Sequence, residues 1–278
     1  LDVVMAMDMV VHPTDTDTVL VGCGNLSSAG RGIYRTVDGG ESWTQVSGGG
    51  VPLDFAGKIQ FGVTPADADV VYASIGNGFT SNQGFTWLLR SDDFGATFAL
   101  QSTVDYSRWQ GWFAHDVAVH PTDPDTIICI GIDVWKSVDA GATLEQKTSW
   151  TAFFTGDIPD GGPEGFPNYS HADHHDVIFD PSDGDVFYLA NDGGVFRSTD
   201  LGETYAGVNG GYQTTQFYNG SYSSPTDPNL AMGGLQDNAS VIYRGNGLWA
   251  RWVNGGDGGW CAVHPEDPDI MYATSQFL

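Results

Sequence analysis

Residues 171–205 read HADHHDVIFDPSDGDVFYLANDGGVFRSTDLGETY and contain the two patterns that decide the fold. The first pattern is an apolar alternation that ends at a proline, followed by an acidic turn and a second apolar run. The second is a turn of the form Ser/Thr-x-Asp-x-Gly-x-Ser/Thr-aromatic, with a basic residue before it. Because alternate side chains of a strand point to opposite faces, the stretch predicts a hairpin followed by further short strands.

Both patterns recur along the chain. The apolar pattern is centred on six marker prolines, Pro13, Pro65, Pro121, Pro181, Pro225 and Pro265. The turn pattern reads TVDGGESW at 36–43, SDDFGATF at 91–98, SVDAGATL at 137–144 and STDLGETY at 198–205. Units of four short strands, repeated about every 40–50 residues, are typical of propeller blades.

The sequence therefore predicts an all-β protein, with one partial β-propeller of four-stranded blades spanning 1–278. The predicted blades are 1–54, 55–108, 109–170, 171–213 and 214–255, with a half blade at 256–278. A closed ring must pair its ends, and the sixth unit lacks two strands. We therefore expect an incomplete ring and a polypeptide with further domains.

The four turn motifs resemble the Asp-box, or bacterial neuraminidase repeat. In this motif the Asp carboxylate can accept hydrogen bonds from turn N–H groups, the Gly supplies a positive φ, and the aromatic residue wedges between sheets. We expect these residues to be structural rather than catalytic. They are Asp38, Gly40, Trp43, Asp93, Gly95, Phe98, Asp139, Gly141, Asp200, Gly202 and Tyr205.

Two closer resemblances concern function. The stretch from 171 to 278, with GGLQDN at 233–238 and GDGG at 256–259, resembles large secreted bacterial Asp-box proteins related to the sortilin propeller. That resemblance implies an extracellular location and a larger parent protein. The chain is also similar to xyloglucan-active endoglucanases, which pair two Asp-box propellers around a glycan cleft. Their Asp-x-Gly-Gly-x-aromatic-Arg segment corresponds to 192–197 here, which is one residue shorter.

The charge of the chain excludes some partners. Ten Lys and Arg residues face 35 Asp and Glu residues, for a formal net charge of −25. Phosphate binding needs clustered cations, so nucleic acid and anionic membrane surfaces are excluded. No apolar run is long enough to insert into a membrane. The acidic residues suit a soluble extracellular surface, or in part bind Ca²⁺.

The long loops predict where a site lies. In a four-stranded blade the acidic turns and motif turns share one face, and the longer loops lie on the other, where function usually resides. The pairs 115–116 and 175–176 occupy equivalent places at the start of two innermost strands. The expected ligand contacts are His115, Asp116, His175, Asp176, Trp109 and Trp112.

The same loops offer metal ligands. His171, Asp173 and His174 could hold a cation, although alternate strand residues point in opposite directions. Calcium, bound by carboxylates and backbone carbonyls, is favoured over a transition metal, because cleanly spaced His ligands are absent. The alternative is that these groups hydrogen-bond loop backbones, and no cofactor is required.

Two functions remain open from sequence. The leading hypothesis is a secreted binding or structural module that recognises a glycan or an extracellular protein. The alternative is a glycoside hydrolase acting through two carboxylates. Its candidate residues are Asp176, Asp192, Asp237 and Asp257. Sialidase chemistry is not supported, because it needs several arginines on one carboxylate, and the arginines outside the repeat lie in separate units.

Overall fold

The computed structural model describes residues 5–78, 86–155, 165–210, 216–253 and 256–276. These residues form 22 β-strands and two short 3₁₀ segments, η1 (Arg108–Gln110) and η2 (Trp150–Thr155). No helix within these ranges has the length and apolar character needed to cross a membrane. The fold is therefore nearly all β.

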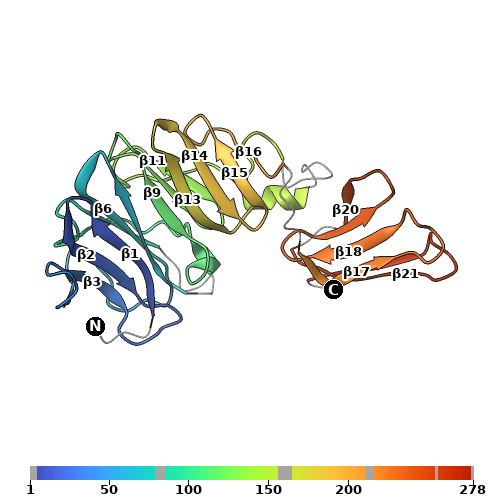
Figure 1. Cartoon of the computed structure of the whole chain (residues 1–278), viewed down its shortest axis with the longest axis horizontal. Coiled ribbons are helices and arrows are strands. Elements are labelled where there is room, and N and C mark those ends of the chain that lie inside the picture. Colours follow the sequence, from blue (N-terminus) through green and yellow to red (C-terminus); the bar gives the residue numbers. More distant parts are fainter. Residues whose placement is uncertain (1–4, 79–85, 156–164, 211–215, 254–255, 277–278) are drawn as a thin grey trace.

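The strands form five four-stranded antiparallel sheets and one two-stranded sheet, each in sequence order, which we call blades 1 to 6 (Figure 1). Blade 1 comprises β1 (Ala6–His12), β2 (Asp15–Cys23), β3 (Gly32–Thr36) and β4 (Thr44–Gln45). Blade 2 comprises β5 (Ile59–Thr64), β6 (Asp67–Ile75), β7 (Trp87–Ser91) and β8 (Ala99–Ser102). Blade 3 comprises β9 (Asp116–Val119), β10 (Ile127–Ile130), β11 (Val134–Ser137) and β12 (Glu145–Gln146).

The remaining blades follow the same plan. Blade 4 comprises β13 (His174–Asp180), β14 (Asp183–Asn191), β15 (Gly194–Ser198) and β16 (Ala206–Gly207). Blade 5 comprises β17 (Phe217–Ser223), β18 (Ala231–Leu235), β19 (Ser240–Tyr243) and β20 (Trp249–Val253). Blade 6 comprises β21 (Gly258–Val263) and β22 (Met271–Ser275). Within the described residues, the predicted five full blades and one half blade are thus present.

The motif turns are held by their own side chains. In blade 2, Oδ1 of Asp93 accepts the N–H of Thr97 at 2.8 Å and the hydroxyl of Ser91 at 2.8 Å. Gly95 has φ of +73°, a conformation that L side chains rarely adopt. The turns around Asp38, Asp139 and Asp200 make the same carboxylate-to-N–H contact four residues on. These hydrogen bonds fix the turn between the third and fourth strands of blades 1 to 4.

Buried apolar clusters join neighbouring blades. Blades 1 and 2 share a cluster that includes Leu20, Ile59 and Phe61, and blades 2 and 3 share one that includes Tyr72 and Val117. A third cluster joins blades 3 and 4, and a fourth joins blades 5 and 6. Cys23, Cys129 and Cys261 are buried free thiols.

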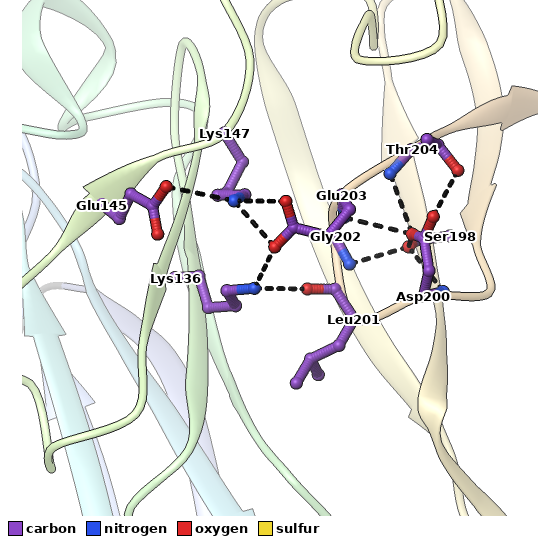
Figure 2. Close-up of polar contacts among 9 residues, drawn as sticks. All are labelled: Lys136, Glu145, Lys147, Ser198, Asp200, Leu201, Gly202, Glu203 and Thr204. Carbon is purple, nitrogen blue, oxygen red and sulfur yellow. Dashed lines mark hydrogen bonds and ion pairs between the residues drawn. The ribbon is translucent and has the colours of Figure 1, made fainter.

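Polar contacts reinforce the same interfaces. Between blades 3 and 4, Glu203 pairs with both Lys136 and Lys147, and the Lys136 ammonium donates to the carbonyl of Leu201 at 3.2 Å (Figure 2). Glu145 pairs with Lys147 from the other side, at 3.2 Å. Blade 3 is therefore tied to the motif turn of blade 4.

The junction between blades 4 and 5 differs. Within the described residues, no buried apolar cluster spans it. The junction is bridged by polar contacts, in which Nε2 of His171 lies 3.2 Å from the carbonyl of Asp237 and Asn238 donates to the carbonyl of Asp192 at 3.0 Å. Figure 1 shows β17, β18, β20 and β21 standing apart from β13–β16.

Candidate functional site: a carboxylate cluster between blades 4 and 5

Three carboxylates converge at the junction of blades 4 and 5. Asp173 directly precedes β13, Asp192 lies in the β14–β15 turn, and Asp237 lies in the β18–β19 turn. Asp173 and Asp237 have φ of +59° and +57°, which Asp tolerates better than most residues. One carboxylate oxygen from each of the three lies within 4.8 Å of the others.

Neighbouring groups orient the cluster. The Gln110 side chain donates to Oδ2 of Asp173 at 3.2 Å. The N–H of Asp237 donates to Oδ1 of Asp257 at 2.8 Å. The site therefore combines a 3₁₀ segment before blade 3, two loops of blade 4, a turn of blade 5 and the loop before blade 6.

The crowding of like charges alters the protonation of the cluster. Burial first, and then the carboxylates of Asp192 and Asp257, raise the pKa of Asp237 to about 7. Burial, followed by the Asp192 carboxylate, raises the pKa of Asp173 to about 6. Burial and the neighbouring carboxylates thus make two of the three carboxyl groups harder to ionise than an exposed Asp.

An imidazole and an aromatic ring lie beside the cluster. The Nε2 atom of His175 lies 2.6 Å from Oδ1 of Asp192, so the ring N–H donates to that carboxylate. The Phe113 ring meets the His175 ring edge-on, with ring centroids 4.7 Å apart. Phe113 is 43% exposed, so part of its apolar surface is available to a ligand.

The predicted candidates separate into groups. Asp192, Asp237 and Asp173 lie together, with His175 and Asp257 in contact with them. Asp176 is not part of this cluster. It lies with Asp116 at the start of the innermost strands, where Asp8 and the buried Lys58 add further charges. Burial raises the pKa of Asp116 to about 8.

Three of the predicted histidines are interior groups. His115 is fully buried, and its Nδ1 lies 2.8 Å from the hydroxyl of Ser74. His174 is also fully buried, and its ring donates to the carbonyl of Gly131 at 2.9 Å and accepts from Ser170 at 3.0 Å. His171 is buried against backbone carbonyls. Burial lowers the pKa of His115 to about 3 and of His174 to about 4, so both are neutral.

These placements correct two sequence expectations. His115 and His175 are equivalent when counted back from the marker prolines, but β13 has a register shift between His174 and Asp176, so the fully buried His174 takes the place of the fully buried His115. The expected metal set of His171, Asp173 and His174 does not converge, because His174 points into the core. Asp173 instead groups with Asp192 and Asp237.

The predicted tryptophans lie elsewhere. Trp109 packs edge-on against Trp150 and lies under the Arg108 guanidinium. With Trp135 it lines a depression of about 300 Å³, which none of the clustered carboxylates lines. The carbonyl of Trp112 accepts a hydrogen bond from Asn25 at 2.7 Å, which fixes its loop on blade 1.

Phe113 and Gln110 were not identified from sequence. Gln110 ends η1 and Phe113 lies between η1 and β9, close to the Trp109 and Trp112 that were selected for their aromatic character. The available signal was the position of Phe113, two residues before His115 on the loop-rich side. Residue type alone did not separate its exposed ring from buried aromatics.

Solved structures with a similar fold are known. The GH74 xyloglucanase from Xanthomonas campestris matches with a TM-score of 0.53 and 20% identity, over 96% of this chain and 41% of that chain. An ancestral GH74 enzyme matches with a TM-score of 0.50 and 15% identity, over 95% of this chain and 33% of that chain. The fold is a β-propeller. At these identities the likeness shows the fold alone.

Other comparisons are less informative. YCF48 from Cyanidioschyzon merolae matches at a TM-score of 0.46 and 11% identity, over 97% of this chain and 71% of that chain. No protein-family model and no curated protein sequence matches the chain. The chain spans less than half of either GH74 structure, so the activity of a whole enzyme cannot be assigned from these similarities.

Proposed function

We propose that this propeller is a glycan-binding module whose ligand meets the loop-rich face at Asp173, Asp192 and Asp237. The observation that carries the proposal is the convergence of these three carboxylates beside the exposed ring of Phe113. Carboxylates accept hydrogen bonds from neighbouring sugar hydroxyls, and an aromatic ring offers an apolar surface for the sugar face. The acidic surface of the chain suits a neutral polysaccharide better than an anionic one.

In this proposal the module is secreted and belongs to a larger extracellular protein. The resemblance to secreted Asp-box proteins and the net charge of −25 support that location. An extracellular protein is the alternative ligand class. Because the first similar structure is a xyloglucanase, xyloglucan is the polysaccharide to test first.

Calcium is the proposed ion of the cluster. Three carboxylates from two blades supply the hard oxygen ligands that Ca²⁺ prefers, and a divalent cation would offset their mutual repulsion. Asp173, Asp192 and Asp237 would hold it. The ion would then join blades 4 and 5 and leave open positions for sugar hydroxyls.

The binding test compares matched variants. In isothermal titration with xyloglucan oligosaccharides, Asp192→Asn and Asp237→Asn should each weaken binding about tenfold or more, because a hydrogen bond to a charged group contributes about 1.5–3 kcal/mol. Phe113→Ala should also weaken it. Asp69→Asn, a carboxylate near the start of β6 that pairs with His12 and lies outside the cluster, should bind as the unmodified chain does. Unchanged affinity in Asp192→Asn and Asp237→Asn would exclude this site.

Hydrolysis is the second candidate, and the raised pKa of Asp237 favours it. A glycosidase needs one protonated carboxyl as general acid and a second carboxylate, about 5 Å away in retaining enzymes. Asp237, with a pKa raised to about 7 by burial, could donate the proton, and Asp192 would be the second group.

Release of reducing sugar from xyloglucan measures this activity. If Asp237 is the acid, the rate should fall as the pH rises above about 7, because the carboxyl then loses its proton. Asp237→Asn should abolish the activity, and with it the fall in rate above about pH 7. Binding without release at any pH would leave only the binding function.

A further inference from the structure

The depression beside Trp109 lies between blades 2 and 3, apart from the carboxylate cluster. Its volume of about 300 Å³ is at the lower end of the range of small-molecule sites. It is lined by Val104, Asp105, Arg108, Trp109 and Trp135. The first four belong to the connection from β8 to β9, and the last lies on β11. Blades 2 and 3 share a buried core, so the depression lies within the stack and not at an end of it.

A buried polar network fixes the turn that carries Arg108 and Trp109. The side chains of Thr86 and Ser107 are fully buried, and their hydroxyl oxygens lie 2.6 Å apart. The N–H of Ser107 also donates to the Thr86 hydroxyl, at 3.2 Å. Oδ1 of Asp105 accepts the N–H of Arg108 at 3.0 Å. Arg108 has φ of +38°, which is uncommon outside glycine, so its neighbours hold the turn in a specific conformation.

The rings of the depression are also held in place. The guanidinium of Arg108 lies over the Trp109 ring, 5.8 Å from its centroid, and the Trp150 ring packs edge-on against Trp109 at 5.9 Å. The backbone N–H of Trp150 donates to Oδ1 of the buried Asp133 at 2.7 Å. Trp135 packs against the core between blades 2 and 3. A ligand therefore loses little affinity to the ordering of these walls.

The depression presents polar groups that the fold leaves unused. Both hydrogen bonds that Asp105 accepts use Oδ1, so Oδ2 has no donor among the described residues. The exposed Arg108 guanidinium makes no ion pair or hydrogen bond in those ranges. The indole N–H groups of Trp109 and Trp135 likewise find no acceptor in the described part of the chain. Three donor groups and one acceptor thus border a single small volume.

This combination matches a sugar ring. A pyranose has an apolar face that packs on aromatic side chains, and hydroxyl groups that donate to a carboxylate and accept from guanidinium and indole N–H groups. Arg108 disfavours a cationic ligand, and Asp105 and the net charge of −25 disfavour an anionic one. We propose that the depression binds one uncharged pyranose unit of a glycan. The ring contacts Trp109 and Trp135. Its hydroxyl groups bind Asp105 and Arg108.

The segment η1 connects this subsite to the carboxylate cluster. Arg108 and Trp109 line the depression, and Gln110, which follows them, donates to Oδ2 of Asp173 at 3.2 Å. The depression is therefore a second sugar subsite next to the proposed one. The inference rests on the proposed function only in taking the ligand to be a glycan, because none of the clustered carboxylates lines the depression.

Isothermal titration with neutral oligosaccharides of xyloglucan, cellulose, mannan and starch tests the subsite. At least one should bind the unmodified chain. Asp105→Asn should weaken that binding about tenfold or more, because the amide keeps an acceptor for the Arg108 N–H but replaces the unused carboxylate oxygen by a donor. Trp109→Ala should weaken it by a similar factor. Trp109→Phe, which keeps a ring against Trp150, should weaken it about threefold or more through loss of the indole N–H.

Two control variants on blade 5 keep the test specific. Trp252→Ala removes an indole that is 39% exposed, and Arg244→Ala removes an exposed guanidinium. Both should bind as the unmodified chain does. Circular dichroism of every variant checks that the blades remain folded. A loss of affinity in the controls equal to that in Asp105→Asn would overturn the subsite, because the effect would then not be local.

The subsite and the carboxylate cluster give separate outcomes. Unchanged affinity in Asp105→Asn and Trp109→Phe would overturn the subsite even where Asp192→Asn weakens binding. Weaker binding in these two variants together with unchanged binding in Asp192→Asn would support the subsite and exclude the cluster. Binding of none of the four neutral glycans would overturn the assignment. So would tighter binding of an acidic oligogalacturonide that Arg108→Gln abolishes, because the site would then select a carboxylate.

Discussion

Asp237 lies where three acidic side chains approach one another. The structure tolerates this crowding because Asp257 accepts the Asp237 N–H and because a raised pKa lets the carboxyl keep its proton near neutral pH. The same pKa makes the residue costly to ionise. When a carboxyl group has a higher pKa in the folded protein than in the unfolded chain, its ionisation destabilises the fold. The free energy of unfolding therefore falls as the pH rises from the unfolded-state pKa through the folded-state pKa.

Asp237→Asn should therefore stabilise the ion-free protein above about pH 7, and the difference should disappear below about pH 4, where the carboxyl is protonated in both states. Thermal melting of both proteins with a chelator present, at pH values from about 4 to above about 7, measures this difference in stability. Added Ca²⁺ should reverse the order, since only the unmodified cluster retains all three carboxylates. A melting temperature of the unmodified chain that is insensitive to Ca²⁺ would exclude the ion.

At the scale of strands and blades, small residues determine how closely neighbours approach. Gly62 of β5 faces β9 of blade 3, where a Cβ would lie 2.6 Å from the carbonyl of Val117 and 3.1 Å from Cγ2 of Val119. The neighbouring atoms belong partly to the backbone, which cannot rotate away. Val10 and Ala118 have this place in blades 1 and 3, and each packs into the core shared with the next blade.

Gly62→Ala should consequently destabilise the protein by about 1–3 kcal/mol, as overpacked positions do. Chemical denaturation measures the change. Gly210→Ala is the matched control, because a Cβ there meets nothing within 4 Å. Equal stability of the two variants would show that blades 2 and 3 separate freely at this contact.

The whole molecule consists of two stacks of blades. Blades 1–4 share continuous buried clusters, blades 5 and 6 share their own, and polar contacts bridge the two stacks within the described residues. Without a shared apolar core, the two stacks need not unfold together.

Calorimetry should therefore show two transitions. Met232→Ala, in the core between blades 5 and 6, should lower only one of them, by about 2–5 kcal/mol in free energy. Ile128→Ala, equally buried between blades 3 and 4, should lower only the other. A single transition that both variants shift equally would contradict the division into two stacks.

The repeat was sufficient to predict the fold class, because each marker proline and acidic turn defines a hairpin by local rules. It was not sufficient for the site. Asp192 and Asp237 were candidates by loop position, but their proximity to Asp173 depends on how blade 5 lies against blade 4. The repeat is degenerate there, with Ser221 where other blades have apolar residues. His115 and His175 are equivalent in sequence, and only three-dimensional packing distinguishes the buried ring from the accessible one.

The polar junction also has a mechanical consequence. If the chain is pulled from its two ends, blades 4 and 5 should separate first, since no buried apolar cluster spans their junction among the described residues and polar contacts such as those of His171 and Asn238 bridge it. Each stack would remain intact until its own strands peel apart. The carboxylate cluster would be divided by the same movement, so tension on the chain and occupancy of the cluster would oppose each other.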